Sequence, residues 1–148
     1  MRTDDTLDEE IGELLARHGQ RYTTGRRAIV AALRNAGQPV TIPQILDRSN
    51  GLAQSSVYRN LVVLEDVAAV VRIVTNDEFA RYELAETLTE HHHHMICSSC
   101  GDVADFSLPE SAEQRLDKQL HAAAQATGFS IEGHRLDLVG TCQDCVPA

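Results

Sequence analysis

Two Cys-x-x-Cys pairs are the feature that most limits what this chain can fold into. They contain the only cysteines among its 148 residues, at Cys97, Cys100, Cys142 and Cys145. Two such turns supply four thiolates at about 2.3 Å from one ion, the tetrahedral environment of structural Zn²⁺. The long separation between the pairs predicts that a whole strand-helix-strand module is closed by the metal. Structural disulfides or a redox dithiol are the alternatives, which an intracellular chain with no other thioredoxin-like feature disfavours.

A run of four histidines stands directly before the first cysteine pair. If the run is extended, its two-residue period places His91 and His93 on one face of a strand, and His92 and His94 on the other. Residues two apart are about 6.5–7 Å apart, so both imidazoles of a face can reach one ion. The pattern therefore predicts that one strand serves two further metal sites. His134 is another histidine that could act as a ligand there. A solvated polar tract or a tag fragment is the alternative, which the internal position of the run disfavours.

Charge is unevenly distributed, although the net charge is −9. Residues 1–18 carry two Arg and six acidic residues, and residues 19–72 carry seven Arg and three acidic residues. Residues 73–148 carry four basic and thirteen acidic residues. A basic middle beside an acidic, histidine-containing C-terminal part suggests that one part binds a polyanion and the other binds cations.

The chain lacks the sequence signals of a membrane or exported protein. No apolar run approaches the roughly 18–20 residues that a membrane span needs, and residues 1–10 are acidic where a secretion signal would be basic and then apolar. We therefore expect a cytoplasmic protein without membrane contact. With no Trp, three Phe and three Tyr, its core is expected to be mostly aliphatic.

Apolar periodicity in the N-terminal part predicts four helices and a hairpin. The first helix carries Leu7 to Leu15, the second is capped by Thr24 and ends at Gly37, the third follows Thr41, and the fourth opens at Ser55 and includes Ala68. Residues 70–75 and 79–84 predict a β-hairpin with its turn at 76–78. Together these elements predict a winged helix-turn-helix domain over residues 1–84.

The C-terminal part predicts a small α/β domain over residues 91–148. A short polar segment at 85–90 precedes it and is interpreted as a hinge. Strands are expected at 93–97, 102–106 and 131–139, with a helix at about 110–127 between the second and third. The predicted fold class is therefore α+β, with a winged helix-turn-helix followed by a module closed by a four-cysteine zinc site.

In their order and spacing these motifs resemble the ferric uptake regulator (Fur) family of metal-dependent bacterial repressors. The resemblance covers nearly the whole chain and rests on Thr24-Gly-Arg-Arg27, Ser55-Ser-Val-Tyr-Arg-Asn-Leu61, Arg81-Tyr-Glu-Leu84, the histidine run, His134 and the cysteine pairs. It implies an N-terminal DNA-binding domain, a C-terminal dimerisation domain and no enzymatic activity. It also implies a homodimer that binds an inverted-repeat operator on double-stranded DNA and controls metal-homeostasis genes.

The resemblance further implies three metal sites. The structural Zn²⁺ ligands are Cys97, Cys100, Cys142 and Cys145. The regulatory ligands, for Fe²⁺, Zn²⁺, Mn²⁺ or Ni²⁺, are Glu83, His92, His94 and Asp105. The ligands of an additional site are His91, His93, Glu113 and His134, with Glu110 as an alternative to Glu113.

The DNA contacts that the resemblance implies are Arg21, Ser55, Ser56, Tyr58 and Arg59. Two serines at a helix N-terminus also suit phosphate oxygens on physical grounds. Arg21 is expected to enter a neighbouring minor groove, and Arg26 and Arg27 are expected to contact phosphates. The alternative is that these exposed side chains only solvate a helix face.

Some positions depart from the family pattern. Gln38-Pro39-Val40 stands where many members have a hinge-site histidine. Ala85 and Val71 stand where zinc-sensing members have Cys and Asp. The connection before the histidines is also longer, which leaves Glu86 as an alternative to Glu83.

Other classes of protein fit the motifs less well. A zinc hydrolase or deaminase would need a His-Glu-x-x-His motif, or a His-x-Glu paired with Pro-Cys-x-x-Cys, and the sequence has neither. A metal-buffering zinc protein without specific DNA binding and a peroxide-responsive regulator of the same family are the remaining alternatives.

Overall fold

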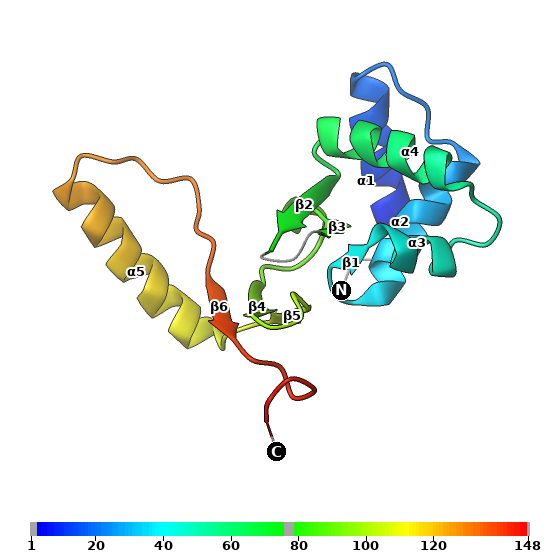
Figure 1. Ribbon diagram of the computed structural model, residues 1–148. Coiled ribbons are helices and arrows are strands. Elements are labelled where there is room, and N and C mark those ends of the chain that lie inside the picture. The colour runs from blue at the N-terminus through cyan, green and yellow to red at the C-terminus, as the bar shows by residue number, and fades with distance from the viewer. Residues whose placement is uncertain (1–2, 76–78, 148) are drawn as a thin grey trace.

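The computed structural model describes residues 3–75 and 79–147 and has an α+β fold, as predicted (Figure 1). The elements are α1 (Asp4–Arg17), α2 (Thr24–Ala36), β1 (Val40–Thr41), α3 (Ile42–Arg48), α4 (Gln54–Asp66), β2 (Val70–Val74), β3 (Ala80–Leu84), the 3₁₀ turn η1 (Glu86–Leu88), β4 (His93–Cys97), β5 (Val103–Phe106), α5 (Glu110–Ala126) and β6 (Asp137–Gly140). The predicted turn at 76–78 lies outside the described residues.

Helices α1 to α4 and the sheet β1-β3-β2 share one hydrophobic core. The central strand β3 pairs antiparallel with both β1 and β2. Each helix contributes a fully buried aliphatic side chain, namely Ile11, Ile29, Ile45 and Leu64. The arrangement is a winged helix-turn-helix in which β2 and β3 form the wing.

Local signals explain where α2 begins and ends and where α3 begins. The hydroxyl of Thr23 caps α2, so the prediction of Thr24 as the cap is wrong by one residue. Thr41 caps α3 in a reciprocal capping box with Gln44, as its position before that helix suggested. Gly37 ends α2 at a φ of 66°, a conformation that glycine adopts without steric cost.

Helix α4 differs from the prediction at both ends. It begins at Gln54 rather than Ser55, and it ends before Ala68. Ala68 has a φ of 60°, and the next amide, of Ala69, donates to the Leu64 carbonyl oxygen at 2.9 Å. This left-handed turn redirects the chain into β2. Apolar periodicity did not reveal the turn, because it placed Ala68 within the helix.

The C-terminal sheet has the order β5-β4-β6. Strand β4 is central, antiparallel to β5 and parallel to β6. The predicted third strand at 131–139 is wrong in its first part, because the pairing with β4 runs only from Asp137 to Gly140. Asp137 pairs with His94 and β4 begins one residue earlier, at His93, so residues 131–135 have no part of β4 beside them to pair with. The short strand β1 was not predicted.

The segment 85–90 is tied to the N-terminal core at its start. The Ala85 amide donates to the Ala69 carbonyl oxygen at 2.9 Å, and Leu88 of η1 is 4% exposed within the core. Helix α5 lies on the far side of the second sheet from the winged helix (Figure 1). Among the described residues, Ala124 is the one residue of α5 that is buried. No helix in the described ranges is both long and apolar enough to cross a membrane.

Candidate metal centres and nucleic-acid interface

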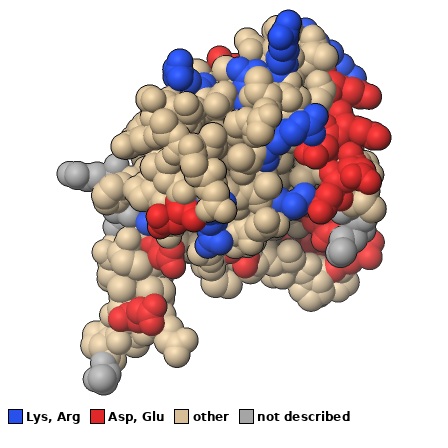
Figure 2. Space-filling view, turned by 90° about the vertical axis from the view of Figure 1, so that its right-hand side faces the viewer, with Lys and Arg blue, Asp and Glu red and all other residues tan. Residues whose placement is uncertain are grey.

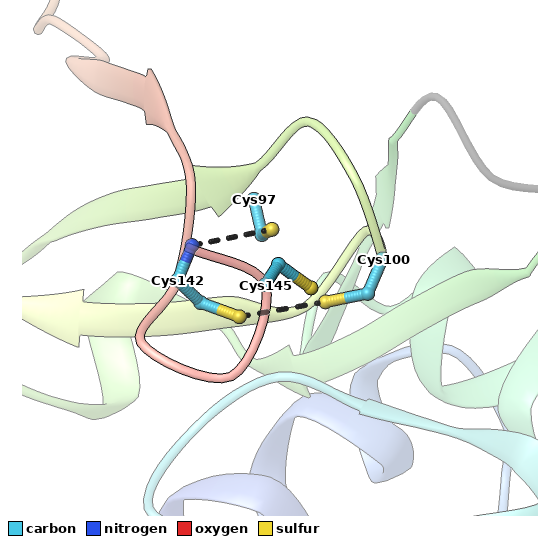
Figure 3. A group of neighbouring side chains, drawn as sticks. All are labelled: Cys97, Cys100, Cys142 and Cys145. Carbon is cyan, nitrogen blue, oxygen red and sulfur yellow. Dashed lines mark hydrogen bonds between the residues drawn. The ribbon is translucent and has the colours of Figure 1, made fainter. Parts of the chain in front are cut away.

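The ends of β4 and β6 bring the four cysteines together (Figure 3). Their Sγ atoms all lie within 4.8 Å of one another, and those of Cys100 and Cys142 are 3.8 Å apart. A tetrahedron of sulfurs at about 2.3 Å from a central ion has edges of about 3.8 Å, whereas a disulfide requires about 2.05 Å. All four thiols are free. The cluster therefore fits Zn²⁺ and not disulfides.

The thiols of this cysteine cluster differ in acidity. Backbone N–H donors, first that of Cys142 at 3.3 Å from the sulfur and then that of Cys100, lower the pKa of Cys97 to about 6. The neighbouring sulfurs of Cys142 and Cys100 raise the pKa of Cys145 to about 12. The pKa of Cys97 is thus lowered while that of Cys145 is raised, and a cation beside the sulfurs is what would hold all four as thiolates.

A second cluster joins the wing to the other half of the molecule. It consists of Glu83 at the end of β3, His92, His94 in β4, and Asp105 in β5, and we call it the wing cluster. The Nε2 atoms of His94 and His92 lie 2.8 and 3.1 Å from the Glu83 carboxylate oxygens. The same two atoms lie 3.5 and 3.8 Å from the Asp105 oxygens. Ligands at 2.0–2.2 Å from one ion are about 2.9–3.5 Å apart, so the donor set fits a divalent cation.

The electrostatics of the wing cluster also favour a bound cation. Burial lowers the pKa of His92, but the Glu90 carbonyl and the Glu83 and Asp105 carboxylates outweigh it and raise that pKa. The hydrogen bond to Glu83 raises the pKa of His94 against the effect of burial. Burial, and then the Glu83 charge, raise the pKa of Asp105. Two close carboxylates thus favour positive charge beside them, which protons or a metal ion can provide.

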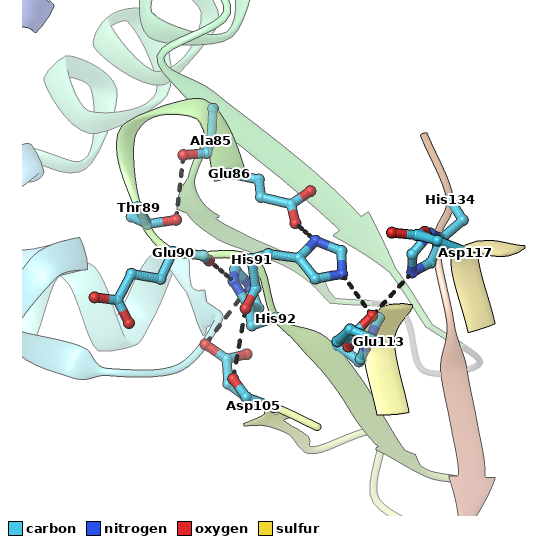
Figure 4. Close-up of polar contacts among 12 residues, drawn as sticks. Ala85, Glu86, Thr89, Glu90, His91, His92, Asp105, Glu113, Asp117 and His134 are labelled. Carbon is cyan, nitrogen blue, oxygen red and sulfur yellow. Dashed lines mark hydrogen bonds and ion pairs between the residues drawn. The ribbon is translucent and has the colours of Figure 1, made fainter. Parts of the chain in front are cut away.

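The opposite face of the histidine run forms the three-histidine cluster of His91, His93, Glu113 and His134 (Figure 4). His93 Nε2 contacts Glu113 Oε1, and the Nε2 atoms of His91 and His134 lie 3.4 and 3.6 Å from Glu113 Oε2. Burial opposes ionisation of Glu113, but the hydrogen bond from His93 and the nearby imidazoles outweigh it and lower its pKa.

Several buried atoms of the three-histidine cluster are unsatisfied. Among the described residues, His93 Nδ1, Glu113 Oε2 and His134 Nε2 are buried without a hydrogen-bond partner. Two of these atoms face the centre of the cluster, where a cation would satisfy both. The alternative ligand Glu110 instead accepts a hydrogen bond from Gln114 at 3.3 Å, outside the cluster.

The structure places the alternative ligands Glu83 and Glu86 in different surroundings. It also shows two further carboxylates beside the clustered histidines. Glu83 lies with His92 and His94, whereas Glu86 contacts His91. Asp117 lies 3.1 Å from His134 Nδ1, and Asp137 lies 3.5 Å from His94 Nδ1. Sequence reasoning missed both aspartates. Asp117 follows Glu113 by four residues, a helical spacing that could have identified it.

The predicted DNA contacts lie on or beside α4 and before α2. Tyr58 is 52% exposed, and Arg59, Ser55 and Arg21 are exposed, while Ser56 is partly buried. The N-cap residue of α4, Ala53, offers no side-chain cap, so the first N–H groups of this helix suit phosphate oxygens. Figure 2 shows basic side chains spread over the upper part of one face and acidic ones along its right-hand edge.

Two other arginines are engaged within the protein. Arg26 Nε donates to Asn60 Oδ1 at 3.1 Å, which ties α2 to α4. The Arg27 guanidinium lies 4.0 Å over the Tyr22 ring and 3.4 Å from Asp8. These contacts give both side chains a structural role, which the expectation of simple phosphate contacts did not foresee.

A winged helix joined to a module with three clusters of metal-ligand side chains defines a class of metal-responsive transcriptional regulators. The sequence model of the ferric uptake regulator family matches residues 17–139. The chain is 33% identical over 141 residues to the peroxide operon regulator of Bacillus subtilis, covering 93% of this chain and 92% of the relative. It is 32% identical over 150 residues to the ferric uptake regulation protein of Campylobacter jejuni, covering 95% and 89%.

Solved structures agree on the fold. The ferric uptake regulator of Helicobacter pylori superposes with a TM-score of 0.78 at 22% identity, covering 99% of this chain and 96% of that one. The chain belongs to the ferric uptake regulator family. Members of this family are dimeric DNA-binding regulators with metal sites, and the relatives are not enzymes.

Proposed function

We propose that this protein is a repressor of metal-homeostasis genes whose homodimer binds an inverted-repeat operator when the wing cluster holds a divalent metal. The observation that carries the proposal is the position of Glu83. It ends the wing strand of the DNA-binding half, yet its oxygens lie 2.8–3.2 Å from the imidazoles of His92 and His94 in the other half. A shared ligand set couples the orientation of the two halves to metal occupancy.

The chain's own residues set this coupling. A divalent ion bound there would supply positive charge between the carboxylates of Glu83 and Asp105. His92 and His94 present Nε2 from one strand face, and Glu83 brings the wing to them. A 100-fold preference of metal for the DNA-competent orientation corresponds to about 2.7 kcal/mol.

The proposed zinc and sensor ions follow from the donor types. Four thiolates select structural Zn²⁺, whereas histidine and carboxylate ligands suit Fe²⁺, Mn²⁺, Zn²⁺ or Ni²⁺. We assign the cysteine cluster to structural zinc and the three-histidine cluster to an additional ion.

Exposed apolar side chains support a homodimer through the C-terminal half, residues 91–148. Phe129 is 72% exposed, Val139 is 71% exposed, and Leu138 and Met95 are close to half exposed. These residues belong to β4, β6 and the segment after α5. A dimer that covers them would carry two copies of α4, each with Tyr58 and Arg59 exposed, as an inverted-repeat operator requires.

Removing the two histidines of the wing cluster tests the proposal. The double variant His92→Ala/His94→Ala should lose metal-dependent operator binding in a gel-shift titration with buffered metal, while remaining a folded dimer. The matched control is His18→Ala/His121→Ala, which removes two exposed histidines, one at the end of α1 and one in α5, outside all three clusters. An unchanged metal response in the first variant would reject the assignment, and absence of operator binding in the parent would favour a metal-buffering protein.

A peroxide response is the second candidate, favoured by the named relative from Bacillus subtilis. The wing cluster offers only nitrogen and oxygen donors, a set that suits Fe²⁺, and Fe²⁺ reacts with peroxide. Under this alternative, peroxide treatment of the Fe²⁺-loaded protein should add one oxygen atom to His92 or His94 and abolish operator binding. The Mn²⁺-loaded protein serves as the control. Retention of operator binding by the treated iron form would exclude this candidate.

A further inference from the structure

Three ring nitrogens that face away from the two histidine clusters lie beside an oxygen atom, whereas His93 Nδ1 has no partner among the described residues. These contacts join His92 Nδ1 to the Glu90 carbonyl oxygen at 2.9 Å, His94 Nδ1 to Asp137 at 3.5 Å, and His134 Nδ1 to Asp117 at 3.1 Å. An acceptor at Nδ1 holds the hydrogen there and leaves the Nε2 lone pair for a cation. Such outer acceptors orient metal-binding histidines and increase their basicity.

His91 follows the same rule, but its acceptor comes from a different part of the molecule. Its Nδ1 contacts Glu86 Oε1, while its Nε2 faces Glu113 Oε2 at 3.4 Å (Figure 4). The His91 ring also lies edge-on to the rings of His93 and His134, at centroid distances of 4.8 and 5.0 Å. The ring is thus held between η1 on one side and the cluster on the other.

The turn that carries Glu86 is anchored in the N-terminal half. Leu88, two residues further along η1, is buried in the core of the winged helix. Ala85, which precedes the turn, is hydrogen-bonded to Ala69. The three-residue turn therefore has its apolar side in the DNA-binding half and its carboxylate on the three-histidine cluster.

The Glu86–His91 pair is not explained by its contribution to folding. Its side chains are 47% and 41% exposed, and exposed ion pairs add little to stability. Orientation of a ligand is the role that the geometry favours, because the contact fixes the Nε2 direction of the most exposed imidazole in the cluster.

We propose that Glu86 is a positioning residue for the three-histidine cluster. A cation held there restrains η1 and thereby residues 85–90, the linker between the two halves. The inference rests on the proposed function in one respect only, namely that this cluster takes a divalent cation. It assigns the additional site a role in holding the linker, separate from the Glu83 contact of the wing cluster.

Cobalt binding tests the positioning role. The parent for this test is the full chain with His92→Ala/His94→Ala, which removes the wing cluster, and with zinc retained at the cysteine cluster. In this parent the visible d–d absorption of Co²⁺ reports on the three-histidine cluster. Adding Glu86→Ala should weaken Co²⁺ binding about 10–100-fold and change that spectrum. Adding Glu86→Gln, which keeps an acceptor oxygen, should restore most of the affinity. The control Glu90→Ala removes an exposed carboxylate from the same linker and should have no effect.

Equal Co²⁺ affinity of the Glu86→Ala protein and its parent would overturn the positioning role. Equal losses in the Glu86→Ala and Glu90→Ala proteins would also overturn it, since the effect would then be one of net charge.

Hydrogen exchange tests the effect on the linker. The amides of Leu88 and Thr89 donate within the turn, to the carbonyl oxygens of Ala85 and Glu86 at 2.9 and 3.1 Å. Saturation of the same parent with Zn²⁺ should slow their exchange. The slowing should be absent in the saturated Glu86→Ala protein and present in the saturated Asp117→Asn protein, which loses a carboxylate that lies beside the cluster and outside the linker.

Slowing in the saturated Glu86→Ala protein, or none in the parent, would refute the linker role. Neither measurement involves DNA. Failure of operator binding would therefore count against the proposed function without affecting the inference.

Discussion

Protons and metal ions compete for the same two nitrogens in the wing cluster. Nearby oxygens raise the pKa values of His92 and His94 in the metal-free protein above the usual value of about 6.5. A raised pKa means that the protonated imidazoles stabilise the metal-free fold fully below about pH 6.5, and that this stabilisation is lost as the pH rises through the raised values. Metal binding requires the neutral rings and has the opposite pH dependence.

We therefore expect metal affinity at the wing cluster to fall as the pH is lowered, starting above pH 6.5. The fall should approach about 100-fold per pH unit once both rings are protonated, because two protons must leave. Calorimetric titration with Mn²⁺ between pH 8 and pH 6, with zinc content checked at each pH, measures this. A flat affinity over that range would contradict the raised pKa values.

A second expectation at the residue scale concerns Cys97. Its sulfur accepts the Cys142 amide, and it is the cysteine of its cluster with the strongly lowered pKa. The variant Cys97→Ser should lose one zinc per chain by elemental analysis and melt at a lower temperature. Ser99→Ala, an exposed change within the same Cys-x-x-Cys turn, should retain the metal. Full zinc content in the Cys97→Ser protein would remove it from the proposed ligand set.

At the scale of elements, two left-handed residues end two helices in different ways. Gly37 closes α2 at a φ of 66°, whereas an alanine, Ala68, adopts a φ of 60° after α4. Alanine carries a steric cost in this region that glycine does not. The turn after α4 is therefore imposed by the packing of the next two residues, because Ala69 and Val70 are buried in the core.

Ala68→Gly should stabilise the protein slightly, by up to about 1 kcal/mol, since relief of the left-handed strain exceeds the added freedom of the unfolded chain. The reverse change, Gly37→Ala, should destabilise it by about 1 kcal/mol, because no atom lies within 4 Å of the added Cβ and the cost is conformational. Urea unfolding of both variants measures the pair. Destabilisation by Ala68→Gly would show that the strain at this turn is negligible.

At the scale of the whole molecule, the C-terminal half leaves much of its apolar surface uncovered within one chain. Phe129 is 72% exposed beside an α5 helix with little buried surface. Burying a Phe side chain contributes roughly 1.5–3 kcal/mol. A second copy of the chain that covers this face would therefore gain substantial stability from a few residues.

Phe129→Glu should raise the dimer dissociation constant at least tenfold, which corresponds to the lower end of that contribution. Sedimentation velocity over a concentration series measures it. Phe79→Glu is the matched control, because Phe79 is 57% exposed in the wing half. An unchanged dimer in the Phe129→Glu protein would place the interface elsewhere.

The amino-acid sequence by itself determined the cysteine and histidine donors and most elements. Cys-x-x-Cys spacing and the two-residue period of His91–His94 are local properties, so the cysteine cluster and the two histidine faces could be predicted before any pairing was known. Helical periodicity likewise located α1 to α3 and α5 within about three residues at each end.

Only the tertiary structure decided which carboxylates join which histidines. The register of β4 with β5 and β6 sets Asp105 and Asp137 on either side of His94. The path of the chain after the wing gives Glu83 to one cluster and Glu86 to the other. These partners come from separate strands and turns. Their contacts depend on strand register and chain direction, which no local pattern of residues specifies.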